Sequence, residues 1–379
     1  MNPIYLDQAS TTVVDPQVLK AMLPYFSQLY ANPSSLHEEG RKVKGIVAEC
    51  RRKIAGILNA QAEEIIFTSG GTESNNLAIK GIALARGKGH IITSRIEHPS
   101  VLEVCKHLET KGFSVTYLPV DKCGLIILAE LEKAIRKDTI LITIMYANNE
   151  IGTVQPIREI GKIAQSIAQK QKISFHTDAC QAGWLDLNVQ KLNVDLLTLN
   201  SSKIYGPKGV GILYRRKGLT IEPLLHGGGQ EFGLRSGTEN VPGIVGLGKA
   251  LELRQQGKEG ELKRLMELRH YFIRQVLKEI PVVVLNGHPR QSLPGIINLS
   301  FAGVEAESLV HYLSQQQIYV SSGSACASNQ VKVSHVLKAI KAKYPRGSIR
   351  FSLGKETSKK ELQEVVKALR EIVPVLRKV

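Results

Sequence analysis

The sequence is poor in cysteine, and its cysteines follow no metal-binding or disulfide pattern. The five are far apart and none belongs to a CxxC pair: Cys50, Cys105, Cys123, Cys180 and Cys326. An odd number of scattered cysteines argues against a disulfide framework and a structural zinc site, so we expect no metal. This pattern fits a reducing compartment and predicts a cytoplasmic protein.

Long apolar segments and export signals are also missing. No apolar run approaches the roughly 20 residues needed to cross a bilayer. The first ten residues, MNPIYLDQAS, lack the basic start and the apolar stretch of a signal peptide. These absences predict a protein that is neither exported nor embedded in a membrane.

Aromatic residues are scarce, and positive charge is in excess. Phe, Trp and Tyr make up 5% of the chain, while 50 Lys and Arg against 34 Asp and Glu give a net charge of +16. This balance favours an anionic substrate, an acidic partner or nucleic acid. Because no DNA-binding or RNA-binding motif accompanies it, a solvated basic face is the favoured interpretation over direct nucleic-acid binding.

Strand-like and helical segments alternate from about residue 16 to residue 255, which predicts a sheet covered by helices on both faces. After Gly257 the chain changes to a long charged helix and short strands, where a second domain begins. We expect a large α/β domain over residues 15–257 and a smaller α+β domain formed by residues 1–14 and 258–379. Ser358 and Glu361 have capping-box spacing at the start of a last helix.

Three segments of the expected large domain end in residues that together suit a phosphorylated aldehyde cofactor. Gly71 and Thr72 lie between a strand and a helix, a position that suits either a phosphate cradle or an ordinary tight turn. Asp178 follows the strand-like KISFHT, where it is either a partner for a protonated ring nitrogen or a turn residue. Lys203 ends the segment LLTLNSSK, where it is either a nucleophile toward an aldehyde or a surface lysine. Together the three match the parts of a pyridoxal-phosphate site.

Cys326 lies in SSGSACASNQ, a run of small residues that specifies neither helix nor strand. We expect an accessible loop there, over about residues 321–332, which is a suitable place for a reactive thiol. The other four cysteines lie in regular segments or a turn, and we interpret them as inert.

With these residues assembled, the sequence resembles the cysteine desulfurases of the NifS/IscS type, in the class V aminotransferase group of fold-type I pyridoxal-phosphate enzymes. The likeness extends nearly from end to end. Its motifs occur in family order: YLDQASTT, FTSGGTESNN, EHPSV, NNEIGTVQPI, HTDACQ, KIYGPKGVG, GGGQE, RSGTEN, SSGSAC and SIRFSLG. The resemblance implies a large domain with a mainly parallel seven-stranded sheet between helices, a smaller α+β domain and a homodimer.

The resemblance also implies how pyridoxal 5'-phosphate is held. Lys203 would carry it as a Schiff base, Asp178 would pair with its pyridine nitrogen, and His98 would stack on the ring and help to move protons. The other cofactor contacts would come from Gly71, Thr72, Asn200 and Ser202 to the phosphate, Gln181 to the ring oxygen, and Thr238 to the phosphate of the neighbouring subunit.

For the substrate, the resemblance implies that Asn149 and Arg350 hold the carboxylate of L-cysteine. Cys326 would take the sulfur as an enzyme persulfide, leaving L-alanine. The sulfur would pass to an acceptor such as an iron-sulfur scaffold or a tRNA-thiolation protein.

Two positions depart from the family pattern. The family usually has S-x-H-K at the Schiff-base lysine, where this chain has Asn200-Ser201-Ser202-Lys203, and we expect a functional site with weaker cofactor affinity. Phe232 stands where many relatives carry arginine, which removes a cation near the site. The alternatives are a selenocysteine lyase, which would need Cys326 less, and a non-catalytic binding subunit.

Overall fold

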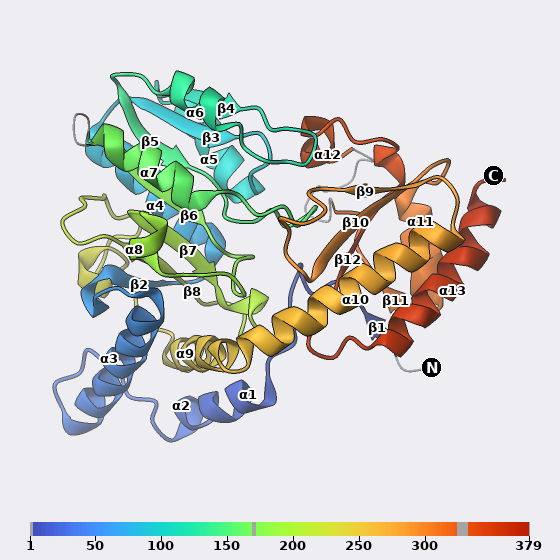
Figure 1. Cartoon of the computed structure of the whole chain (residues 1–379). Helices are drawn as coiled ribbons and strands as arrows, with labels where there is room; N and C mark the ends of the chain where they lie inside the picture. The colour runs from blue at the N-terminus through green and yellow to red at the C-terminus, as the bar shows by residue number, and fades with distance from the viewer. Residues whose placement is uncertain (1–2, 169–171, 324–332, 379) are drawn as a thin grey trace.

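The computed structural model describes residues 3–168, 172–323 and 333–378. A seven-stranded sheet with its helices forms the larger part of the molecule, on the left in Figure 1. A three-stranded and a two-stranded sheet lie with the C-terminal helices on the right, beside both chain ends. The long helix α10 (Lys258–Glu279) begins next to the larger part and crosses the smaller one.

The large sheet is mainly parallel, as expected. Its strand order is β2-β8-β7-β6-β5-β3-β4. Only β8 pairs antiparallel, with β2 on one side and β7 on the other. The strands are β2 (Ile65–Thr68), β3 (His90–Ser94), β4 (Ser114–Leu118), β5 (Thr139–Thr143), β6 (Ser174–Asp178), β7 (Leu196–Asn200) and β8 (Gly211–Arg215).

Helices cover both faces of this sheet, which explains why central strands such as β3 and β6 are buried along their whole length. The α-helices of this part are α1 (Pro16–Met22), α2 (Pro24–Ser27), α3 (Glu38–Leu58), α4 (Gly71–Arg86), α5 (Pro99–Glu109), α6 (Leu128–Ala134), α7 (Ile157–Ala168), α8 (Val189–Leu192) and α9 (Val241–Gln255).

The smaller part is an antiparallel sheet packed against helices. Strand β10 lies between β9 and β12, and β1 pairs in parallel with β11. Its other elements are β1 (Ile4–Tyr5), β9 (Val283–Asn286), β10 (Ile296–Phe301), α11 (Ala306–Gln315), β11 (Ile318–Tyr319), α12 (His335–Ala339), β12 (Ser348–Ser352) and α13 (Lys359–Leu376). The expected capping box is confirmed, because Ser358 and Glu361 exchange hydrogen bonds at the start of α13.

The two parts have separate cores. One cluster of buried side chains, including Ile142, Phe175 and Leu197, packs against the large sheet. Another, including Phe272 and Phe351, lies under α10 and α13. These clusters support our proposal that residues 15–257 form one domain and residues 1–14 and 258–379 the other.

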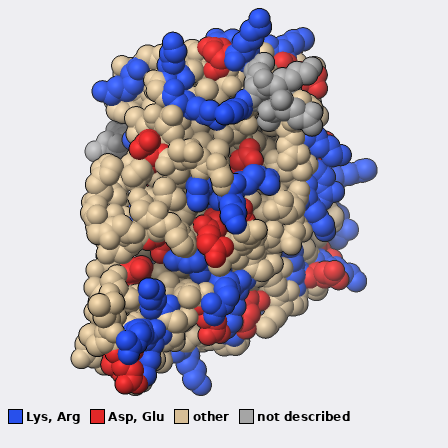
Figure 2. Space-filling view, turned by 90° about the vertical axis from the view of Figure 1, so that its left-hand side faces the viewer, with Lys and Arg blue, Asp and Glu red and all other residues tan. Residues whose placement is uncertain are grey.

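The charge distribution is mixed on the face that Figure 2 shows. Lys and Arg side chains are spread over this face with Asp and Glu side chains between them, rather than gathered in one basic patch. Among the described residues, no helix is long and apolar enough to cross a membrane.

Candidate active site

A cavity of about 330 Å³ lies where the central strands of the large sheet end. Because β3, β5, β6 and β7 are parallel, the residues that follow them meet at one edge, where ligands of open α/β sheets bind. Nine of the predicted site residues line this cavity: Gly71, Thr72, His98, Asn149, Asp178, Gln181, Asn200, Lys203 and Arg350.

Lys203 enters the cavity from a single 3₁₀ turn, Ser201–Lys203, directly after β7. Its ammonium group donates a 2.9 Å hydrogen bond to the carbonyl of Ala9 and a further one to the carbonyl of Ser10. Gln181 also donates to the Ala9 carbonyl, at 2.9 Å. The N-terminal segment therefore holds the lysine and the glutamine on the same wall.

Asp178, the last residue of β6, is buried with both carboxylate oxygens hydrogen-bonded. The backbone N–H of Cys180 donates to Oδ1 at 2.9 Å, and Asn75 Nδ2 donates to Oδ2 at 2.7 Å. Asn75 also donates to the Ser100 hydroxyl at 2.9 Å, while its own Oδ1 is buried without a partner among the described residues. Sequence reasoning missed Asn75, although it lies one helical turn after Gly71 in FTSGGTESNN.

His98 is the N-cap of α5, where Pro99 occupies the first helical position. Its Nδ1 accepts the backbone N–H of Ser100 at 3.1 Å and lies 2.8 Å from the Ser100 hydroxyl. Burial lowers the pKa of His98 below its ordinary value. The imidazole is therefore neutral at pH 7, with its proton on Nε2.

The N-terminus of α4 forms one end of the cavity. Gly70 precedes the helix with a φ of 151°, and a Cβ on Gly71 would lie 2.6 Å from Cys180 Sγ, so a larger residue would fill the cradle. The Asn200 side chain packs beside Gly71, with its Nδ2 3.7 Å from that Cβ position. Helix N–H groups and the amide thus form a donor set for an anion.

Ser202 does not line the cavity. Its hydroxyl donates to Asn200 Oδ1 at 3.3 Å, as does its backbone N–H. These two hydrogen bonds orient the Asn200 amide, so that its Nδ2 faces α4.

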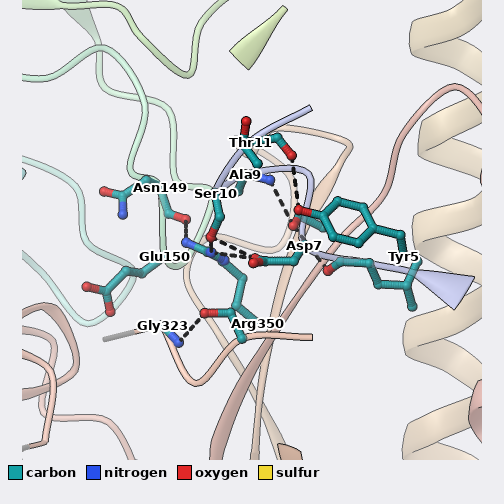
Figure 3. A network of polar contacts seen from close by, with 12 residues as sticks. Tyr5, Asp7, Ala9, Ser10, Thr11, Asn149, Glu150, Gly323 and Arg350 are labelled. Atoms are coloured by element: carbon teal, nitrogen blue, oxygen red, sulfur yellow. Dashed lines mark hydrogen bonds and ion pairs between the residues drawn. The ribbon is translucent and has the colours of Figure 1, made fainter. Parts of the chain in front are cut away.

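Arg350, on β12, brings the smaller part of the molecule into the site (Figure 3). The side chain is buried and donates to Asp7 at 2.7 Å, to the Ser10 hydroxyl at 2.6 Å and to the Asn149 carbonyl at 2.9 Å. Its Nε is buried without a partner among the described residues. Asp7, which sequence reasoning also missed, thus holds the guanidinium in place while donor positions remain for a carboxylate.

The four described cysteines are poor candidates for a reactive thiolate. Burial raises the pKa of Cys105 to about 12 and that of Cys180 well above its ordinary value. Burial also raises the pKa of Cys50 and Cys123. All four are therefore thiols at pH 7.

Three further residues of interest are Cys326, Thr238 and Phe232. Cys326, with residues 324–332, lies outside the described residues, although Gly323 before it lines the cavity. Thr238 is exposed and does not line the cavity of its own chain. Phe232 has its ring centroid 5.0 Å from the Arg51 guanidinium, and the adjacent Glu231 forms a buried ion pair with that arginine.

Pyridoxal phosphate suits this set of groups. The cavity offers an amine on one wall, a buried carboxylate for a protonated ring nitrogen, a neutral imidazole and the N-terminus of a helix for a phosphate. No group of three or more His, Cys, Asp or Glu side chains suited to a metal is found among the described residues.

Comparison with known proteins gives the same assignment. The aminotransferase class-V family matches residues 4–365. Cysteine desulfurase IscS of Dictyoglomus turgidum is 52% identical, over 99% of this chain and 95% of the relative. Cysteine desulfurase IscS of Methanosarcina thermophila is also 52% identical, over 99% of this chain and 93% of the relative. A solved structure titled NifS-like protein has a TM-score of 0.92 and 38% identity, over 98% of this chain and 100% of that one.

The chain belongs to the pyridoxal-phosphate-dependent aminotransferase class-V family and, within it, to the cysteine desulfurases of the NifS/IscS type. The fold class and the cofactor expected from the sequence are thereby confirmed.

Proposed function

We propose that this protein removes sulfur from L-cysteine, gives L-alanine and retains the sulfur as a persulfide on Cys326. The observation that carries the proposal is the one cavity in which Lys203, Asp178, His98 and Arg350 meet. The selenocysteine lyase and the non-catalytic subunit have no observation in their favour.

Each described residue has a chemical task in this reaction. Bound pyridoxal phosphate supplies an aldehyde carbon for Lys203 and an electron-withdrawing ring that stabilises negative charge on the substrate α-carbon. Asp178, fixed by Asn75, keeps the ring nitrogen protonated. Arg350 and Asn149 orient the substrate carboxylate, and the Lys203 amine moves the α-proton.

Sulfur transfer falls to Cys326. Its thiolate attacks the substrate sulfur, an S–S bond forms, and the electrons of the broken C–S bond return to the carbon skeleton, which takes up protons and leaves as alanine. The raised thiol pKa of the four described cysteines supports this assignment by elimination. An acceptor protein, such as an iron-sulfur scaffold or a tRNA-thiolation protein, then takes the sulfur.

We also propose that two copies assemble. Large apolar side chains lie exposed on and beside α1 and α2, which isolated chains rarely tolerate: Leu19, Leu23, Phe26, Tyr30 and Leu36. Thr238, exposed and outside its own cavity, would reach the phosphate of the neighbouring subunit. Light scattering should give a dimer mass, and Phe26→Asp with Tyr30→Asp should give a monomer.

The test of the activity is the release of alanine and sulfide from L-cysteine under a reductant. We expect equal amounts from the wild-type protein and none from Lys203→Ala. Cys326→Ala should bind the cofactor and L-cysteine, as seen in the visible absorption spectrum, yet release no sulfide.

Cys180→Ala is the matched control and should retain activity. Sulfide release by Cys326→Ala at the wild-type rate would refute the persulfide step. Rapid turnover of L-selenocysteine but not of L-cysteine by the wild-type protein would instead favour the lyase.

A further inference from the structure

The Ser100 hydroxyl, in the first turn of α5, lies between two other residues of the active-site cavity. Its Oγ is 2.9 Å from Asn75 Nδ2 and 2.8 Å from His98 Nδ1. Asn75 in turn donates to Asp178 Oδ2 at 2.7 Å. All four side chains line the cavity, so the hydroxyl joins the partner of the ring nitrogen to the imidazole. The reaction proposed above gives this hydroxyl no task.

The direction of each hydrogen bond in this chain follows from its two ends. An ionised Asp178 carboxylate only accepts, so Asn75 has to present its NH₂ group, and the same group donates to Ser100 Oγ. At the other end, the backbone N–H of Ser100 donates to His98 Nδ1 at 3.1 Å, so Nδ1 carries no proton. The hydrogen in the 2.8 Å contact is therefore that of the Ser100 hydroxyl.

Two donors from one residue thus converge on His98 Nδ1, the hydroxyl and the backbone N–H of Ser100. A neutral imidazole has one N–H and one acceptor nitrogen, so the proton belongs on Nε2. A proton on Nδ1 would instead face the backbone N–H. The ring can therefore donate a hydrogen bond to a ligand from Nε2, but it has no free acceptor nitrogen to offer.

We propose that Ser100 is a positioning residue, whose hydroxyl, oriented by Asp178 through Asn75, holds His98 Nδ1 as an acceptor and leaves Nε2–H as the group that contacts bound molecules. His98 then serves the reaction as a hydrogen-bond donor and not as a base. The inference rests on the proposed function only for the part that His98 plays in the reaction.

The surroundings of His98 also favour the neutral ring. Burial has the largest effect and lowers the pKa of His98, which Lys203 and His335 lower further and Asp178 raises. The ionisable groups on the elements around the ring are Glu97, Asp178, Cys180, Lys203, His335 and Arg350. Because these groups are the same in the variants of Ser100, a change between those variants reports on the hydroxyl.

The test reads the two ring nitrogens of His98 by ¹⁵N NMR in the cofactor-loaded protein labelled with [¹⁵N]histidine. The signal that disappears in His98→Gln identifies the residue. In the wild-type protein at pH 7, Nε2 should carry the proton and Nδ1 should not. In Ser100→Ala the neutral ring loses a hydrogen bond that only its Nδ1 lone pair can accept, so the pKa of His98 should rise by roughly 0.4 to 1 pH unit.

Two variants control for a merely structural effect. Ser100→Thr keeps a hydroxyl and should titrate like the wild type. Ser166→Ala removes an exposed hydroxyl of α7 that donates to the Ile163 carbonyl, and it should leave the titration of His98 unchanged. Ser100→Ala should fold and bind pyridoxal phosphate, because alanine suits a helix and the bond between Asn75 and Asp178 remains.

A wild-type ring protonated on Nδ1 would overturn the proposal, as would an unchanged pKa of His98 in Ser100→Ala. These readouts do not depend on turnover. A wild-type protein that shows the expected tautomer and shift but forms no alanine from L-cysteine would refute the proposed function and leave this inference standing.

Discussion

Asn75 gives the sharpest test of how the cofactor site is built. Its amide donates to Asp178 at 2.7 Å, a hydrogen bond to a buried carboxylate. Hydrogen bonds to charged groups contribute about 1.5–3 kcal/mol. If that energy serves to fix Asp178 against the ring nitrogen, Asn75→Ala should weaken pyridoxal-phosphate binding by roughly 10- to 150-fold.

The assay is titration of the cofactor-free protein with pyridoxal phosphate, followed by the absorbance of the bound cofactor. Asn76→Ala is the matched control, because this neighbouring amide is partly exposed and, among the described residues, donates only to the Thr72 carbonyl. It should bind the cofactor nearly as well as the wild type.

The spectrum distinguishes a positioning role from a loss of folding. In Asn75→Ala the absorbance of the bound cofactor should change over a different pH range from that of the wild-type protein, because Asp178 no longer fixes the proton on the ring nitrogen. Wild-type affinity in Asn75→Ala, or an equal loss in Asn76→Ala, would refute this reasoning.

Three further predictions concern the same framework. Gly71→Ala should weaken cofactor binding in the same titration, because its Cβ would lie 2.6 Å from Cys180 Sγ, and Gly71→Ala with Cys180→Ala should recover part of the loss. Glu231→Gln should lower stability by about 3–5 kcal/mol in denaturant unfolding, because it breaks the buried ion pair with Arg51. Burial lowers the pKa of His176 to about 4, against about 6.5 when unfolded, so unfolding takes up a proton between these pH values. Stability should therefore fall as the pH decreases from about 6.5 to 4, and a melting-temperature profile should fall less steeply in His176→Gln.

Much of the fold follows from local pattern. Parallel strands buried on both faces often give continuous apolar runs, and the run before Lys203 marks β7 directly. Strand β6, SFHTD, is mostly polar although it is buried, so the pattern marks it less clearly. Parallel pairing then brings the ends of these strands to one edge without any further information. For this reason nine predicted site residues meet in one cavity.

The remaining contacts depend on three-dimensional packing that no local pattern contains. Asn75 and Asn76 are adjacent and identical in type, and only the phase of α4 decides which of them faces Asp178. Asp7 meets Arg350 across 343 residues of sequence. Ser202 has the hydroxyl expected of a phosphate ligand, but the turn before Lys203 directs it to Asn200.

Strand β12 links substrate binding to the chain that leads to Cys326. The backbone N–H of Arg350 donates to the Ser321 carbonyl at 2.7 Å, and the N–H of Ser321 donates back at 3.2 Å. On the far side of residues 324–332, the Ser334 hydroxyl donates to the Glu150 carboxylate at 2.5 Å, next to Asn149. One flank of the cysteine segment is therefore bonded to Arg350, and the other to Glu150, the neighbour of Asn149 in the sequence. A change that moves Arg350 should disturb sulfur transfer as well as substrate binding, whereas a change at Asp178 should act on the cofactor alone.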